Sequence, residues 1–215
     1  MNAWYKCADE AQLEEGLAAA AAAVLSGELV VLPTDTLYGL GADAFSPAAV
    51  ARLVAVKAQP RPAPPAVLVG SVKAASALVE DLGPYGQQLI DEFWPGGLTI
   101  VCRAARTLSW DLGDTRGTVS VRMPEHPVAI ALLRETGPMA VSTANTAGRP
   151  PATNASAALA QLGNEVSVYL DGGQLPEGKP STVVDLTGDI PRLLRQGAIS
   201  IGRLREIAGV QAATG

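Results

Sequence analysis

Helical patterns and short apolar runs follow one another along the whole chain. Apolar positions with helical spacing predict helices at Ala8–Ser26, Ser46–Lys57, Val72–Glu80, Pro84–Phe93, His126–Glu135, Thr153–Leu162 and Ser200–Ala208. Runs rich in apolar and β-branched residues predict strands at Glu28–Leu32, Ala66–Val69, Leu98–Cys102, Thr118–Val121, Met139–Val141, Val166–Leu170, Thr182–Asp185 and Pro191–Leu194. Pro33–Asp43 and Ala58–Pro65 are rich in Gly or Pro and are predicted to be irregular.

This alternation predicts one α/β domain in which helices pack on a sheet, because no convincing linker interrupts it. The closely spaced short strands between residues 98 and 121 favour a mixed sheet over a purely parallel one.

Composition and charge narrow the choice of core and partners. Apolar residues make up 48% of the chain but aromatic residues only 4%, so the core must consist mostly of Ala, Val and Leu. The formal net charge of −5 has the wrong sign for a broad nucleic-acid surface. Two stretches, Ala44–Val79 and Thr136–Asn164, nevertheless contain cations and no acid. They favour a local pocket for an anion, with chance clustering as the alternative.

Several common sites are absent from the sequence. Cys7 and Cys102 fit no metal or redox spacing, and His126 is the only histidine, which we interpret as structural. P-loop, dinucleotide-binding and GxSxG motifs are also missing. The N-terminus lacks the apolar region of a signal peptide, and Leu17–Leu25 is too short to cross a bilayer. We therefore expect a cytoplasmic protein without a membrane partner.

The segment Pro33–Gly41 (PTDTLYGLG) is the first candidate for a binding site. It follows a predicted strand and supplies the hydroxyls of Thr34 and Thr36, the carboxylate of Asp35 and the phenol of Tyr38. Loops that a rigid strand positions often carry binding groups. A polar turn followed by packing glycines is the alternative interpretation.

Four further features could hold an anion. Lys57 and Arg61 flank a stiff, proline-rich loop and could clamp phosphates, unless they are merely solvated at a helix end. Arg122 and Arg195 each follow a predicted strand, where a guanidinium can meet a carboxylate or phosphate; ordinary surface positions are the alternative.

The last candidate is an oxyanion cradle directly after the strand at 139–141. It combines the hydroxyls of Ser142 and Thr143 with the amide of Asn145, and no acid lies nearby.

These segments, in this order, resemble the YrdC-like family of threonylcarbamoyl-AMP synthases, and in particular its actinobacterial type. The motifs are PTDTLYGLG at 33–41, KAQP at 57–60, WPGGLT at 94–99, RMP at 122–124, STANTAG at 142–148, STVVD at 181–185 and LRQG at 194–197. The resemblance covers residues 12–208, which leaves 1–11 as an expected N-terminal extension and 209–215 as a C-terminal tail.

The resemblance implies a fold, a reaction and partners. The fold is an α/β domain whose twisted mixed sheet is flanked by helices and encloses a deep cationic groove. The reaction joins L-threonine, bicarbonate and ATP into threonylcarbamoyl-AMP with release of pyrophosphate, and Mg²⁺ accompanies the ATP. The product would pass to a transferase complex that modifies adenosine 37 of tRNA, and a weak contact with tRNA itself is compatible with the groove.

The resemblance also implies a role for each matching residue, and it implies no metal ligand from the protein. Threonine binding is implied for Thr34, Tyr38, Arg122 and Ser181. ATP binding is implied for Lys57, Arg61, Ser142, Thr143, Asn145 and Arg195. Lys57 and Arg122 are the implied catalytic residues.

Two departures from the family pattern lie in the site loops. Gln59 replaces the second cation of the family's KxR motif, and Ala147 replaces a hydroxyl residue of its SSANxSG motif. These changes leave open an active synthase that tolerates them, a paralogue with altered carbamoyl-adenylate chemistry, and a non-catalytic module that binds nucleotide or RNA.

Overall fold

The computed structural model describes residues 2–58, 63–176 and 178–212, and it forms one α/β domain. Its helices are α1 (Glu10–Leu25), α2 (Pro47–Lys57), α3 (Val72–Ser76), α4 (Gly83–Phe93), α5 (Pro127–Thr136), α6 (Ala155–Leu162) and α7 (Ile201–Ala208), with a 3₁₀ turn, η1, at Gly163–Glu165. Its strands are β1 (Ala3–Lys6), β2 (Val30–Leu32), β3 (Gly39–Asp43), β4 (Ala66–Leu68), β5 (Leu98–Arg103), β6 (Thr118–Arg122), β7 (Met139–Thr143), β8 (Val168–Asp171), β9 (Thr182–Asp185), β10 (Arg192–Arg195) and β11 (Gln211–Ala212).

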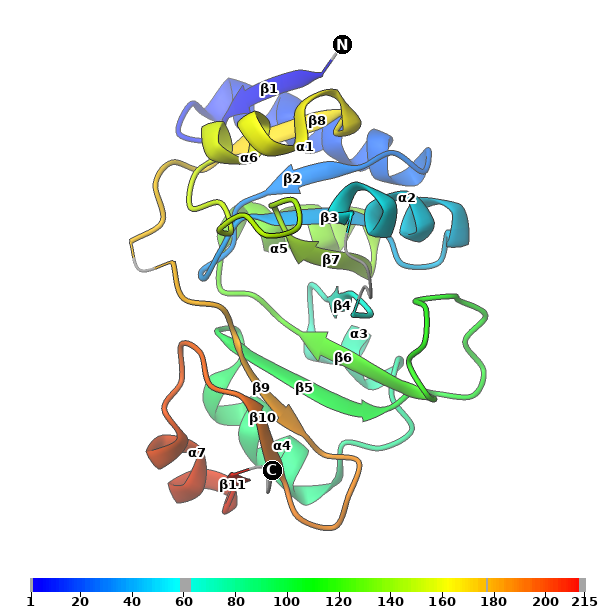
Figure 1. Cartoon of the computed structure of the whole chain (residues 1–215), viewed down its shortest axis with the longest axis vertical. Helices are drawn as coiled ribbons and strands as arrows, with labels where there is room; N and C mark the ends of the chain where they lie inside the picture. The colour runs from blue at the N-terminus through cyan, green and yellow to red at the C-terminus, as the bar shows by residue number, and fades with distance from the viewer. Residues whose placement is uncertain (1, 59–62, 177, 213–215) are drawn as a thin grey trace.

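The described strands form one mixed sheet in the order β1-β8-β2-β3-β7-β4-β6-β5-β9-β10-β11. Figure 1 shows that the strand direction turns steadily from the β1 edge to the β10 edge, as the right-handed twist of strands requires. The antiparallel pair of β7 with β4 joins the half that contains β1, β8, β2, β3 and β7 to the half that contains the other strands. The predicted twisted, mixed sheet is therefore confirmed.

In the first half, helices cover both faces of the sheet. Val30 and Leu32 of β2 pack in one cluster with residues of α1 and α5. Val31, which points the other way, packs in a second cluster with residues of α2 and α6. This is the period-two alternation of a strand, and it explains why β2 is apolar at every position.

In the second half, the same alternation separates a core face from a polar face. Val119 and Val121 of β6 are buried in a cluster with residues of α3, α4 and α7. Ser120 and Arg122 alternate with them and line a cavity instead. The second half thus uses one sheet face for its core and leaves the other available for binding.

Residues near both ends of the described chain pair in the sheet, within the segments expected to be an N-terminal extension and a C-terminal tail. Ala3–Lys6 pairs in parallel with β8, and Gln211–Ala212 pairs in parallel with β10. Domain boundaries at residues 12 and 208 would therefore separate β1 and β11 from the strands with which they pair. The last three residues of the expected tail, 213–215, lie outside the described residues.

Three further details differ from the sequence prediction. Gly39–Asp43 is a strand, although its glycines suggested a turn. Helix α3 ends at Ser76, four residues before the predicted end. Helix α6 begins at Ala155 and not at the predicted Thr153, since the side chain of Asn154 caps it by accepting a 2.7 Å hydrogen bond from the backbone N–H of Ala157.

Of the helices in the described ranges, none is both long and apolar enough to cross a membrane.

Candidate active site

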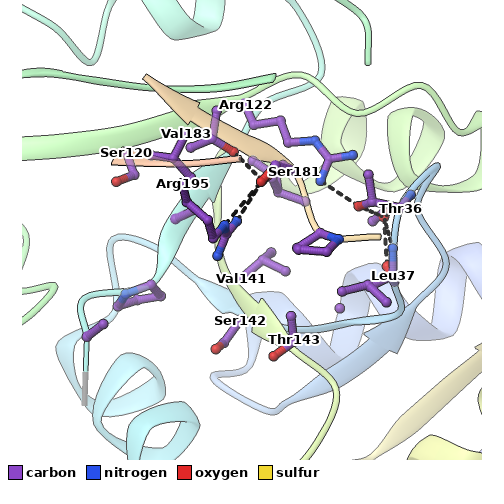
Figure 2. A pocket seen from close by; sticks show the side chains of 18 of the residues that line it. Thr36, Leu37, Ser120, Arg122, Val141, Ser142, Thr143, Ser181, Val183 and Arg195 are labelled. Carbon is purple, nitrogen blue, oxygen red and sulfur yellow. Dashed lines mark hydrogen bonds between the residues drawn. The ribbon is translucent and has the colours of Figure 1, made fainter. Parts of the chain in front are cut away.

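A cavity of about 280 Å³ lies on the polar face of β4, β5, β6 and β9, opposite the loop that joins β2 to β3. Its walls come from segments far apart in the sequence, including the end of β7 and the strand β10 (Figure 2). The polar lining residues include Thr34, Thr36, Thr99, Ser120, Arg122, Ser142, Thr143, Ser181 and Arg195. The structure therefore brings most of the predicted site segments together.

Arg122 is held at one end of the cavity by three separate segments. Its Nε donates to the carbonyl oxygen of Gly96 at 2.9 Å, and one terminal nitrogen donates to Oγ1 of Thr36 at 2.8 Å. The other terminal nitrogen forms a 2.6 Å ion pair with Oδ1 of Asp35. Burial lowers the pKa of Arg122, and the Asp35 carboxylate opposes that shift. The guanidinium thus has a fixed plane and a compensated charge.

Arg195 reaches toward Ser181 on the other side of the cavity (Figure 2). Its terminal nitrogen donates to the carbonyl oxygen of Ser181 at 2.9 Å and to Oγ of Ser181 at 3.1 Å. The Ser181 hydroxyl lies 2.8 Å from that of Thr99. Within the described residues, Arg195 has no carboxylate partner, and burial lowers its pKa. A cation in the cavity wall without a compensating carboxylate favours an anionic ligand.

Thr34 lines the cavity, and its hydroxyl also shapes the loop. Oγ1 donates to the carbonyl oxygen of Leu37 at 2.7 Å and accepts hydrogen bonds from the backbone N–H groups of Thr36 and Leu37. This is a turn in which a threonine side chain satisfies the backbone. Thr34 therefore fixes the shape of the wall that Thr36 and Leu37 present.

Tyr38 is in the cavity wall, yet its ring is fully buried. The ring packs in the same core cluster as Leu40, and its hydroxyl donates to the carbonyl oxygen of Gly173 at 2.6 Å. Burial raises the pKa of this phenol well above its ordinary range. The phenol therefore ties the loop to the segment after β8, away from the predicted contact with threonine.

Lys57 is buried behind the cavity and is not among the lining residues. Its Nζ donates to the carbonyl oxygens of Thr143 and Asn145, at 2.6 and 2.7 Å, and to Oδ1 of Asn145 at 2.7 Å. Burial lowers the pKa of Lys57 to about 8. In this arrangement the ammonium organises the loop after β7, whereas the sequence predicted a direct contact with phosphates.

That loop presents Ser142 and Thr143 to the cavity, while Asn145 lies behind them. Asn145 donates to the carbonyl oxygen of Arg149 at 2.8 Å, which closes the turn. Ala147, one of the two departures, donates its backbone N–H to the carbonyl oxygen of Lys57 at 3.0 Å. A hydroxyl at position 147 is thus not needed for this turn to form.

Gln59 and Arg61 lie outside the described residues, so the structure places neither the predicted phosphate contact nor the other departure.

Thr99 and Ser120 line the cavity but were missed by the sequence analysis, which also named Asp35 without its partner Arg122. A signal for both lining residues is present in the strand patterns. In LTIVCR and TVSVR, Thr99 and Ser120 are the polar residues between apolar core positions.

The chemistry of the cavity favours an anion that also offers hydrogen-bonding groups. Its described lining contains two arginines and several hydroxyls but no Asp or Glu. The described residues also contain no cluster of three His, Cys, Asp or Glu side chains that could hold a metal ion. His126, whose Nδ1 is buried without a hydrogen-bond partner among the described atoms, lies outside the lining.

A family model described as "Telomere recombination", for the Sua5, YciO and YrdC proteins, matches residues 22–197. A Mycobacterium tuberculosis protein named "Putative threonylcarbamoyl-AMP synthase" is 50% identical over 214 residues, which cover 100% of this chain and 99% of that protein. The threonylcarbamoyl-AMP synthase of Bacillus subtilis is 36% identical over 90% of this chain, and the match covers 56% of the Bacillus protein.

Solved structures agree with this relationship. Pyrococcus abyssi Sua5 in complex with L-threonine has a TM-score of 0.88 and 29% identity, and the match covers 98% of this chain and 62% of the Sua5 chain. Escherichia coli YciO, with a TM-score of 0.82 and 24% identity over 94% of this chain and 98% of its own, shares the fold. With a family model over most of its length and a relative at 50% identity over all of it, this chain belongs to the Sua5/YciO/YrdC family.

Proposed function

We propose that this protein is an L-threonylcarbamoyladenylate synthase. The observation that carries the proposal is the pair of arginines at the two sides of one cavity. Arg122 has a compensated charge, and Arg195 has no carboxylate partner among the residues that the structure describes. A substrate with a single carboxylate and a second substrate with several phosphate charges match this pair. The L-threonine complex of Sua5 and the names of the relatives support the same assignment.

The proposed reaction joins the two substrates through bicarbonate. The threonine amine attacks the bicarbonate carbon, and loss of water gives an N-carboxylate. An oxygen of this carboxylate then attacks the α-phosphorus of ATP, and the bond to pyrophosphate breaks. Because two anions must approach each other, positive groups have to offset their repulsion, so catalysis relies on positioning and electrostatics.

The residues of the cavity have distinct proposed roles. Arg122, with Thr36 and the turn formed by Thr34, receives the threonine carboxylate. Ser181 lies between the two substrates, since its hydroxyl contacts both Thr99 and Arg195. Arg195 receives phosphate oxygens, and Ser142 and Thr143 on β7 provide hydroxyl donors on the facing wall.

Magnesium enters the proposal as part of the nucleotide substrate. The described lining lacks the carboxylates that Mg²⁺ prefers in proteins. Phosphate oxygens and water would therefore supply its ligands, and the protein would recognise the Mg²⁺–ATP complex through its phosphates.

We further propose that the product passes to a separate transferase that modifies adenosine 37 of tRNA in the cytoplasm. The net charge of −5 favours at most a weak contact with tRNA itself. Salt-sensitive tRNA binding much tighter than micromolar would contradict that view.

The deciding experiment measures pyrophosphate release from ATP. We expect release that requires both L-threonine and bicarbonate and yields threonylcarbamoyl-AMP, identified by mass spectrometry. Release with another amino acid or a carbamoyl donor would instead identify a paralogue of altered chemistry. ATP binding without any release would identify a nucleotide-binding module, and both outcomes would reject the proposed function.

A further inference from the structure

We propose that Asp35 is a positioning residue that aligns Arg122 and compensates its charge from outside the cavity, so that this end of the cavity accepts one carboxylate and disfavours phosphates. The inference rests on the proposed function for the identity of the two ligands. It assigns a role to an acid that contacts neither ligand. It also explains how two arginines in one cavity can be assigned to different substrates.

Asp35 lies behind the cavity wall. Its neighbours Thr34 and Thr36 line the cavity, but Asp35 does not. The Asp35 side chain is 17% exposed, and Oδ1 accepts hydrogen bonds from Arg122 at 2.6 Å and from the backbone N–H of Glu125 at 2.9 Å. One carboxylate oxygen therefore ties the loop between β2 and β3 to the end of β6 and to the turn before α5.

The orientation of Arg122 depends on this contact. A guanidinium has five N–H donors in one plane, and three of them are used by Gly96, Thr36 and Asp35. Because these acceptors belong to different segments, they fix the plane of the guanidinium and leave two donors for a ligand. A preorganised fork of this kind suits the two oxygens of a carboxylate.

The two arginines also differ in how far their positive charges are compensated. The side chain of Arg122 is 7% exposed and is paired with Asp35, whereas Arg195 donates to oxygens of Ser181 and has no carboxylate partner in the part of the chain that the structure describes. The positive charge of Arg195 further lowers the pKa of Arg122, which places the two cations within electrostatic reach of each other. Without the carboxylate of Asp35, both would present a full positive charge to the same polyanion.

Replacing Asp35 by Asn tests this assignment, because Asn keeps an oxygen acceptor but removes the charge. Isothermal titration calorimetry measures the affinity of the full chain for each ligand without turnover. L-threonine alone and inorganic pyrophosphate alone are titrated in separate experiments. We expect L-threonine to bind at least about tenfold more weakly than to the wild type. We expect pyrophosphate affinity to stay equal or to increase, because the cavity has lost one compensating negative charge.

A matched control is Glu80→Gln, which removes an acid from an exposed ion pair with Arg106 at 2.6 Å. This variant should bind both ligands as the wild type does. Equal weakening of both ligands by Asp35→Asn would show a merely structural role, and unchanged L-threonine affinity would also overturn the inference.

Asp35→Glu provides a second test if Asp35→Asn does not fold. It keeps the charge but displaces it by one methylene, so we expect weaker L-threonine binding with unchanged pyrophosphate binding. Unchanged L-threonine affinity, or a parallel loss of both affinities, would contradict the positioning role. If the wild-type protein binds L-threonine but releases no pyrophosphate, the proposed function is rejected while this test stays valid. If the wild-type protein does not bind L-threonine, the inference itself is overturned.

Discussion

At the scale of single residues, Lys57 shows how a charged side chain can serve a site without entering it. Its ammonium has three donors, and they meet oxygens of Thr143 and Asn145 on the loop after β7. The sequence identified Lys57 as a candidate site residue but did not predict where its side chain points. Spacing in a sequence does not reveal whether a long, flexible side chain turns toward a ligand or toward backbone carbonyls.

We predict that Lys57→Met lowers the free energy of unfolding by about 3 kcal/mol, because it leaves buried carbonyl and amide oxygens without donors. Urea denaturation measures this loss. Lys73→Met, at an exposed position of α3, is the matched control and should change stability little. A stable Lys57→Met variant that has lost only ATP binding would instead support the direct phosphate contact predicted from the sequence.

His126 provides a prediction about pH. Burial lowers its pKa below the ordinary value of 6.5, with Asp35 opposing the shift. As the pH falls below 6.5, the unfolded chain takes up the proton before the folded chain does, so His126 contributes stability that is present above pH 6.5 and is lost on acidification.

The measurement compares urea unfolding at pH 7.5 and 5.5 for the wild type and for His126→Asn, a residue that suits the N-cap of α5. We expect the wild type to lose more stability between the two values than the variant does. Equal losses would mean that other groups account for the acid sensitivity.

At the scale of elements, β3 (GLGAD) is a strand although its glycine-rich sequence suggests a turn. A Cβ on Gly39 would lie 2.7 Å from Cγ1 of Val141, and one on Gly41 would lie 2.6 Å from Cε of Met139. The glycines let β3 pack closely beside β7, so they indicate close packing and not a turn. Local propensity favours a turn for such a segment, whereas its pairing partners decide that it is a strand.

The two glycines should respond differently to alanine. Val141 is branched at Cβ and lines the cavity, whereas the Met139 contact is the end of a flexible side chain. We predict that Gly39→Ala destabilises the protein by about 2 kcal/mol and weakens L-threonine binding, and that Gly41→Ala costs about 1 kcal/mol or less. Thermal unfolding and titration with L-threonine check both, and the reverse order would contradict this packing argument.

Most helices and central strands could be predicted from the sequence, because their patterns are local. Strand β2 has a β-branched run, and α2 has the Ser46 cap followed by Pro47. Edge strands β1 and β11 could not be predicted in this way, since they are short and depend on a distant partner for pairing. The role of Asp35 was hidden for the same reason, because its partner is 87 residues away.

At the scale of the whole molecule, the cavity joins both halves of the sheet. Thr36, in the loop between β2 and β3, and Ser142 on β7 belong to the first half (Figure 2). Ser120 on β6, Ser181 directly before β9 and Arg195 on β10 belong to the second. A ligand that contacts both sets stabilises them together, by a free energy that increases with the logarithm of its concentration relative to its dissociation constant.

We therefore predict that L-threonine with Mg²⁺–ATP slows amide hydrogen exchange in both halves at once. Protection should increase at residues 34–39, 141–145 and 181–183, and it should be partial with either ligand alone. Exchange measured by mass spectrometry, with the exposed turn at 113–117 as an internal reference, checks this outcome. Protection confined to one half would contradict a ligand that spans the cavity.

The pairing of β9 beside β5 has a consequence for synthesis of the chain on the ribosome. Ser181 follows its partner Thr99 by 82 positions in the sequence, and Arg195 comes later still. Such long-range closure is slow, and a growing chain emerges from its N-terminus. A nascent chain that stops before β9 carries Thr34 and Arg122 but lacks Arg195, the second arginine of the cavity, so ligand capture requires synthesis through β10.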